Sequence, residues 1–147
     1  MESVQKTLPS VLANTGTNFF IGNFDKEGFD DGGLKKWKTP ERKIQGTPSF
    51  KYPKTKGLGR RTRKTLIQTG KLKRAVNKSV TEKSFKRIVW RINPSEVPYA
   101  SVHNKGLKAG RGNGFMMPKR EYMGRSRTLD KLFRVKIIQA YKKTFNG

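Results

Sequence analysis

Apolar residues recur at helical spacing in two stretches, one toward each end of the chain. Over residues 128–145 they fall three, four and eight positions apart, which predicts an apolar stripe on an amphipathic helix. The stripe consists of Leu129, Leu132, Phe133, Ile137, Ala140, Tyr141 and Phe145. Thr128 suits the N-cap, and Asp130 suits the positive N-terminal end of the helix dipole. We therefore expect a long C-terminal helix.

Residues 8–28 carry a weaker helical pattern. Two apolar groups have helical spacing, one formed by Leu8, Val11 and Leu12 and the other by Phe20 and Phe24. The polar segment 14–17, which contains Gly16, lies between the two groups and favours a kink or a capped restart. We expect one kinked helix or two helical pieces here.

The middle of the chain predicts shorter elements. Apolar and basic side chains alternate over residues 84–92, which is typical of a strand with one buried face. The apolar face is formed by Ile88, Trp90 and Ile92, and the basic face by Arg87 and Arg91. A short helix is expected to start near Thr69, which would cap it. Residues 97–103 predict a second extended piece or a short helix, and a glycine-rich loop follows over 106–114.

Residues 28–62 show no periodicity and contain three prolines. An irregular stretch of about 30 residues in a compact domain is usually functional or flexible. We expect a flexible basic loop at about 38–63, with Trp37 pinning its start to the core. Together the elements predict a single α+β domain over residues 1–147. It would contain an N-terminal helix, a small antiparallel sheet with a short helix, a long basic loop and a long C-terminal amphipathic helix.

Charge is the composition feature that adds most to this picture. The 147 residues include 34 Lys and Arg but only 10 Asp and Glu, a formal net charge of +24. Such an excess repels itself in a compact chain and favours binding to polyanions. Nucleic acid, a membrane surface or an acidic protein would offset it. No apolar run approaches the ~20 residues that span a bilayer, and the first residues do not resemble a secretion signal. We expect no membrane partner.

The charges are unevenly distributed. Residues 51–74 contain ten basic residues and no acidic one, whereas residues 1–34 contain half of the acidic residues. These acidic residues are Glu2, Asp25, Glu27, Asp30 and Asp31. The acidic end could dock on the basic part of a neighbouring copy or fold back on its own chain, and the pattern leaves both open.

The residue inventory argues against catalysis. The chain has no cysteine, which excludes disulfides and thiolate chemistry, and its one histidine is His103. Residues 25–31 form an acidic cluster that lacks the acidic twelfth position of an EF-hand loop. The glycine-rich segment 106–114 matches neither the Walker nor the dinucleotide-binding pattern. We expect no enzymatic activity, no cofactor and no metal, and a structural role for His103.

Four spaced segments are more specific. They are Trp37-Lys38, the segment L-x-x-T-G-x-L at 66–72, the segment Y-A-x-x-H-x-x-G at 99–106, and P-x-R-x-Y-x-G at 118–124. The residues that define them are Trp37, Leu66, Thr69, Gly70, Leu72, Tyr99, Ala100, His103, Gly106, Pro118, Arg120 and Gly124. We expect structural tasks for them: Tyr99 and Ala100 packed under the sheet, His103 hydrogen-bonded to a loop, and Pro118 and Arg120 fixing the entry to the last helix.

In order and spacing, these segments resemble the tail completion or virion morphogenesis proteins of tailed bacteriophages, both the Mu-type morphogenesis proteins and the small tail components of lambdoid phages. The resemblance covers about residues 17–145. The basic insertion at 41–63 departs from the family pattern, and Tyr122 stands where a Phe is usual. The resemblance implies a virion protein that joins a ring in the neck or the head-proximal tail, beside the DNA channel. It implies further copies of the chain, a tail terminator, a head–tail connector and tail tube protein as partners.

The basic surface would then face double-stranded DNA or an acidic partner. The expected contact residues are Lys51, Lys54, Lys56, Arg60, Arg61, Arg63, Lys64, Lys108 and Arg111. No helix is suited to reading a groove, so DNA contacts would be to phosphates and salt-dependent. The alternative is a stand-alone nucleic-acid-binding protein of ribosomal or nucleoid type. The aromatic residues that lie among the Lys and Arg residues favour it. A nuclease with His103 as base is a third reading.

Overall fold

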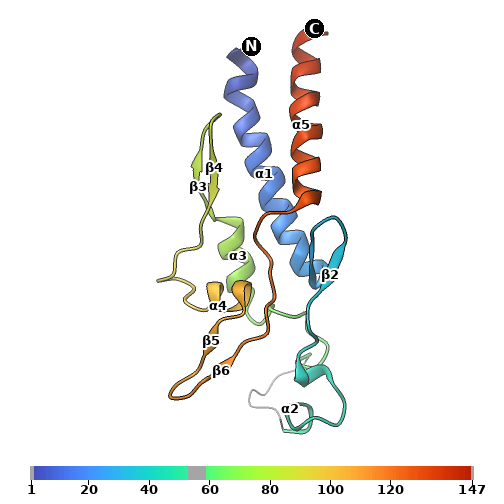
Figure 1. Cartoon of the computed structure of the whole chain (residues 1–147), viewed down its shortest axis with the longest axis vertical. Helices are drawn as coiled ribbons and strands as arrows, with labels where there is room; N and C mark the ends of the chain where they lie inside the picture. The colour runs from blue at the N-terminus through green and yellow to red at the C-terminus, as the bar shows by residue number, and fades with distance from the viewer. Residues whose placement is uncertain (1, 53–58, 147) are drawn as a thin grey trace.

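A computed structural model describes residues 2–52 and 59–146 of the chain. Helices and short antiparallel strand pairs alternate along it, which confirms the predicted α+β class (Figure 1). The order is α1 (Glu2–Lys26), β1 (Gly28–Asp30), β2 (Leu34–Lys36), η1 (Glu41–Lys43), α2 (Pro48–Lys51), α3 (Lys71–Asn77), β3 (Val80–Lys83), β4 (Ile88–Trp90), α4 (Ala100–Lys105), β5 (Lys108–Ala109), β6 (Phe115–Met116) and α5 (Arg127–Phe145).

The two long helices, α1 and α5, lie side by side and form the axis of the molecule. Their terminal ends lie together at one end, while the β5–β6 hairpin and α2 lie at the opposite end (Figure 1). Helix α1 also packs against α3 and the β3–β4 hairpin, so it is the element around which the rest of the chain is arranged.

The core lies along the second half of α1. Phe24 is fully buried, with its ring 5.8 Å from that of Trp37 and 5.1 Å from that of Tyr122. The indole of Trp37 donates a hydrogen bond to the carbonyl of Glu121, 2.7 Å away. The prediction that Trp37 pins the start of the irregular region to the core is therefore confirmed.

Helix α1 is continuous, and the predicted interruption at residues 14–17 is wrong. Gly16 and Thr17 are buried on the helix face that meets the β3–β4 hairpin. The ring of Trp90 packs directly on Gly16, and its Nε1 donates to Thr17 Oγ1 at 3.0 Å. The polar segment is thus the place where the Trp90 indole packs on α1. This packing requires a glycine at position 16 but no interruption of the helix.

The strands form three separate hairpins, β1–β2, β3–β4 and β5–β6, each antiparallel. The strand expected over 84–92 covers only Ile88–Trp90. The start of that segment is a turn, in which Ser84 and Arg87 hydrogen-bond one another through their backbones. The predicted antiparallel sheet is therefore present as three separate two-stranded pairs.

The caps of two helices differ from expectation. Ser126, not Thr128, caps α5, because the Ser126 hydroxyl accepts a hydrogen bond from the Leu129 amide. Thr128 instead donates to Asp30, which ties the start of α5 to the β1–β2 hairpin. Helix α3 begins after Gly70 in the left-handed conformation, one residue beyond the cap expected at Thr69.

The segment at 97–103 forms α4, so the helical alternative holds there. Ala100 is buried as expected, but Tyr99 is 41% exposed and does not pack under a sheet. The expected basic loop at 38–63 contains η1 and α2 among its described residues. Its flexibility and the single-domain boundary remain predictions.

Candidate anion-binding site

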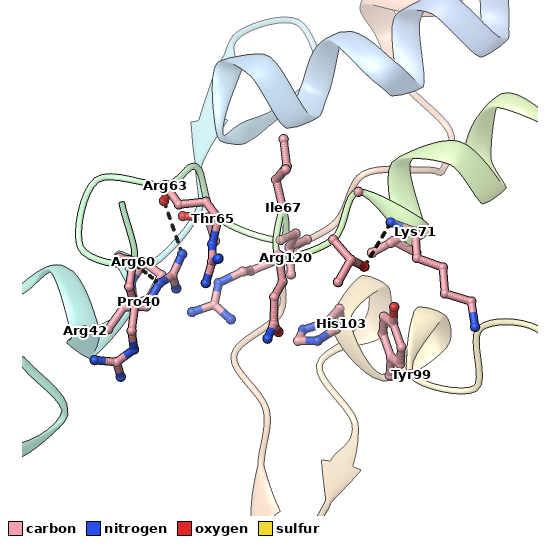
Figure 2. A pocket seen from close by; sticks show the side chains of 15 residues that line it. Pro40, Arg42, Arg60, Arg63, Thr65, Ile67, Lys71, Tyr99, His103 and Arg120 are labelled. Carbon is pink, nitrogen blue, oxygen red and sulfur yellow. Dashed lines mark hydrogen bonds between the residues drawn. The ribbon is translucent and has the colours of Figure 1, made fainter. Parts of the chain in front are cut away.

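A cavity of about 530 Å³ lies between the segment leading into α3, helix α4 and the loop that contains η1. Five basic side chains line it: Arg42, Arg60, Arg63, Lys71 and Arg120. In Figure 2 the first three lie on one side, Lys71 and Tyr99 lie on the other, and His103 and Arg120 lie between them. We call this cavity the basic pocket.

The basic pocket gathers residues from three of the spaced sequence segments. Seven of the twelve motif residues line it: Leu66, Thr69, Gly70, Leu72, Tyr99, His103 and Arg120. Segments 50 residues apart in sequence thus meet at one site. The backbone of Leu66 has a φ of 62°, which is uncommon for any residue other than glycine. This residue lies in the wall of the cavity.

The remaining motif residues support the site from outside. Trp37 and Ala100 belong to the core. Gly106 ends α4 with a φ of 70°, and a Cβ there would lie 2.9 Å from Lys119 Cβ, so only glycine fits. Pro118 and Gly124 flank the strand-like segment that carries Arg120 past α4.

Arg120 is held rigidly at the base of the basic pocket. Its side chain is 8% exposed, and its Nε and Nη2 both donate to the carbonyl of Lys38 at 3.3 Å. Its backbone amide donates to the carbonyl of His103 at 2.8 Å. The expected hydrogen bond between His103 and a loop is therefore made by the His103 backbone carbonyl. Arg120 ties the loop after β2 to α4 rather than fixing the entry to α5.

Arg42 organises the opposite wall. Its guanidinium donates to the carbonyls of Arg60 at 3.0 Å and of Arg63 at 3.2 Å, and so holds the segment on the far side of residues 53–58 against η1. Arg60 in turn donates to the carbonyl of Ser49. These hydrogen bonds position the arginines but bring no negative charge to them.

The positive charges of the basic pocket act on one another. Burial, together with Arg63 and Arg60, lowers the pKa of Arg42, and Glu27 offsets part of this effect. Burial and Arg42 lower the pKa of Arg120, and burial and Arg120 lower the pKa of His103. Among the described residues, no carboxylate lies within ion-pair distance of the five basic residues of the basic pocket.

Two buried nitrogen atoms at this site lack a hydrogen-bond partner in the described part of the chain. They are Nε of Arg63 and Nδ1 of His103. The His103 ring lies edge-on to the ring of Tyr99, with centroids 6.0 Å apart. Buried polar atoms are normally satisfied, so these two are exceptions that lie beneath the surface of the cavity.

The acidic residues near the end of α1 are used elsewhere. Asp25 pairs with Lys64 and Lys73, and Glu27 pairs with Lys43. Asp30 pairs with Lys26, and Asp31 pairs with Lys35 and Arg127. Of the two alternatives for the acidic end, the structure therefore has it folded back on its own chain. None of these carboxylates forms an ion pair with the five basic residues of the basic pocket.

The seven expected contact residues that the structure describes divide into three groups. Arg60 and Arg63 line the basic pocket. Lys64 pairs with Asp25, and Arg61 stacks on the Phe50 ring with its guanidinium carbon 4.0 Å from the centroid. Lys51, Lys108 and Arg111 are exposed, the last two at the β5–β6 hairpin. Lys54 and Lys56 lie outside the described residues.

Sequence reasoning missed Arg42 and Lys71. Arg42 lies just after Pro40 in an irregular stretch, and only the fold brings it opposite Arg120. Lys71 lies in the segment 66–72 at a position that the motif leaves free. A basic residue inside a motif was the one sequence signal that could have pointed to Lys71 as a site residue.

A second surface feature is apolar. Val135, Ile138 and Phe145 on α5 are 49%, 54% and 73% exposed, although the opposite face of the helix packs on α1. On the β5–β6 hairpin, Phe115 and Met116 are also exposed, close in sequence to the exposed basic residues. Both surfaces offer apolar area to a partner.

Other site types find no support in residues 2–52 and 59–146. No three His, Asp or Glu side chains gather there in a group that could hold a metal ion. None of the helices in those ranges has both the length and the apolar character to cross a membrane. Comparison of the chain with protein-family models, curated proteins and solved structures gives no match.

Proposed function

We propose that the chain is a structural protein of a tailed-bacteriophage virion that acts in tail completion or head–tail joining. It assembles with copies of itself into a ring in the neck or the head-proximal tail, beside the DNA channel. Its neighbours are a tail terminator, a head–tail connector or tail tube protein. It uses no cofactor and catalyses no reaction.

The observation that carries this proposal is the second apolar face of α5. A helix that has buried one apolar face against its own chain has no intramolecular need for another. Exposed apolar side chains in a row mark protein interfaces when they occur on an otherwise charged surface. Exposed basic residues, among them Lys131, Arg134 and Lys142, lie on the same face of α5. The arrangement suits subunit contacts in a ring.

The charge distribution supports the location next to DNA. The acidic end of α1 is consumed within the chain, so the excess of basic residues faces outward. Exposed Lys and Arg side chains bind phosphates without sequence preference. A protein that lines a DNA channel needs such contacts, but not base recognition.

Cryo-electron microscopy of the intact virion tests the proposal. We expect the chain to be traceable as a ring around the channel between head and tail tube, with α5 at the contacts between subunits. Absence of the chain from a complete and well-resolved virion would refute a structural role. A ring whose subunit contacts exclude α5 would refute the interface assignment alone.

A stand-alone nucleic-acid-binding protein is the second candidate. The β5–β6 hairpin favours it, because the exposed Phe115 follows Lys108 and Arg111 on a projecting element. An aromatic among basic residues is typical of surfaces on which bases stack. This candidate predicts tight binding of RNA or DNA by the isolated monomer, whereas the virion protein would bind weakly and assemble with other proteins.

A further inference from the structure

We infer that the basic pocket binds the carboxylates of an acidic peptide segment on a protein neighbour, and that DNA is bound elsewhere on the chain. The inference rests on the proposed function, because it specifies how the chain recognises one neighbour in the assembly. It assigns a separate task to the cavity and to the exposed basic residues.

The first step of the argument is charge. Five basic side chains surround the cavity, and no carboxylate in the described chain pairs with any of them. Gathering like charges costs free energy, and the same chain pairs four carboxylates between residues 25 and 31 with other basic residues. Burial lowers the pKa of Arg42, and Glu27 offsets part of this effect without pairing with Arg42. A basic cluster that has no ion-pair partner in the described chain is suited to an anionic ligand.

The second step is rigidity. Arg120 is almost fully buried, and two of its nitrogen atoms are fixed on the carbonyl of Lys38. Arg42 is fixed by the carbonyls of Arg60 and Arg63. Preorganised guanidinium groups lose little side-chain entropy when they bind, and their planar shape matches a carboxylate.

The third step is the size and lining of the cavity. A volume of about 530 Å³ is in the range of pockets that hold small ligands, roughly 300–1,000 Å³. A duplex cannot enter, but one or two amino-acid side chains can. The walls include Leu66, Ile67 and Leu72, and apolar walls fit an acidic peptide with interspersed apolar residues better than a sugar–phosphate backbone.

The fourth step is the alternative surface for DNA. Lys51, Lys108 and Arg111 are exposed on projecting parts of the chain at the end opposite the tips of α1 and α5 (Figure 1). Long exposed side chains reach a phosphate backbone without requiring it to enter a cavity. The two ligands therefore have two distinct surfaces.

His103 provides a direct test, because it is the only histidine in the chain and it lines the basic pocket. The full chain would be titrated with a synthetic peptide of alternating Glu and Leu, and separately with a 20-base-pair duplex, while the imidazole signals are followed by NMR. A bound carboxylate stabilises the charged imidazolium, so we expect the peptide to raise the pKa of His103. The duplex should leave it unchanged.

Matched variants locate the peptide. Arg63→Gln and Lys71→Gln each remove one charge from the basic pocket, and Lys108→Gln and Arg111→Gln each remove one from the hairpin. We expect each pocket variant to weaken peptide binding about tenfold and each hairpin variant to change it less than twofold. Arg120→Gln should abolish binding, but it also loses its anchor on Lys38, so the Arg63 and Lys71 variants decide the result if it fails to fold.

Three results would overturn the inference. One is an unchanged His103 signal at saturating peptide. Another is equal loss of peptide binding in the pocket and hairpin variants. The third is a His103 shift caused by the duplex instead of the peptide, which would assign the basic pocket to nucleic acid. None of these removes the chain from the virion, so failure here is distinguishable from failure of the proposed function.

Discussion

Trp90 rests edge-on against Gly16 in the middle of α1, and its indole nitrogen donates a hydrogen bond to the neighbouring Thr17. The contact joins the β3–β4 hairpin to the central helix. It is possible only because residue 16 has no side chain. The same ring stacks on Phe133 of α5, with centroids 6.4 Å apart, so one indole connects three elements.

Replacing Gly16 with alanine is expected to destabilise the protein. In a helix this exchange normally stabilises by about 0.5–1 kcal/mol. Here the new Cβ would lie 2.9 Å from Trp90 Cη2 and closer still to Cζ2, so the hairpin must shift, at a net cost of about 1–3 kcal/mol. Urea denaturation followed by tryptophan fluorescence measures it.

Gly22→Ala in the same helix is the matched control. No atom lies within 4 Å of the position that its Cβ would occupy. It should stabilise the protein by about 0.5–1 kcal/mol. Equal effects of the two exchanges would contradict the proposed packing.

The stability of the protein should fall between pH 4.5 and pH 2 in part through Glu27. Burial opposes its ionisation, but hydrogen bonds from Thr65 and Lys43 lower the pKa of Glu27 from 4.5 to about 2. A pKa lowered by folding stabilises the native state above pH 4.5, and this contribution disappears as the pH falls toward 2. Glu27→Gln should therefore cost about 1–2 kcal/mol at pH 7, a figure reduced for solvent screening.

Urea denaturation at pH 7 and at pH 3 measures this difference. The gap between the wild-type chain and Glu27→Gln should narrow at the lower pH. Glu96→Gln removes the same charge from an exposed position and should change the free energy of unfolding by less than about 0.5 kcal/mol at pH 7. A constant gap at both pH values would show that the amide disturbs packing instead of removing an ion pair.

Tyr122→Phe tests the junction between the core and α4. The buried hydroxyl of Tyr122 donates to the carbonyl of Ala100 at 2.7 Å. Its removal leaves a buried carbonyl unsatisfied, which costs about 1–2 kcal/mol. Thermal denaturation by circular dichroism would measure the loss. The exposed Tyr52→Phe should be neutral, and a comparable loss there would indicate a general effect of the hydroxyl group.

DNA binding by the hairpin should be visible in its salt dependence. Each phosphate contact contributes about −0.9 to the slope of log K against log salt. Replacing both Lys108 and Arg111 with glutamine should reduce the slope by about 2 in magnitude, which fluorescence anisotropy with a duplex would measure. Lys6→Gln at the far end of α1 should leave the slope unchanged. An unaltered slope in the double variant would exclude phosphate contacts at the hairpin.

The outer face of α5 should govern self-association. Ile138 is 54% exposed, so Ile138→Asp should leave the melting temperature nearly unchanged while it weakens association at least tenfold. Sedimentation velocity over a range of concentrations measures the association of the wild-type chain and of the variant. Gln139→Asp adds the same charge one residue away and should have a much smaller effect. A wild-type chain that remains monomeric at high concentration would contradict this role for α5.

The helices were predictable where periodicity was strong. The helical spacing of the apolar residues from Leu129 onward identified α5, because Leu129 is buried and Phe133 packs against the core at this spacing, whereas Leu132 and Phe145 of the same stripe are exposed. Helix α1 was only half predicted, because Gly16 reads locally as a breaker. Its role depends on Trp90, which lies 74 residues further along the chain, and local patterns carry no such information.

The basic pocket was predictable in its parts but not as a site. The motifs that contain Thr69, His103 and Arg120 were recognised as separate segments, and charge density pointed to Arg60 and Arg63. That they share one cavity follows from the hydrogen bonds of Arg42 and Arg120 to distant carbonyls. Backbone carbonyls leave no signature in a sequence, so neither arginine could be placed.

The partnership of α1 with α5 also has a consequence for biosynthesis. Asn23 donates a hydrogen bond to the carbonyl of Tyr122, 99 residues away, and Ser126 donates to that of Asp30, 96 residues away. Helix α1 is therefore made well before the segments that complete its packing, and the part of its face that they cover stays open until they leave the exit tunnel. Chaperones that recognise exposed apolar segments would meet α1 before α5 is available to cover it.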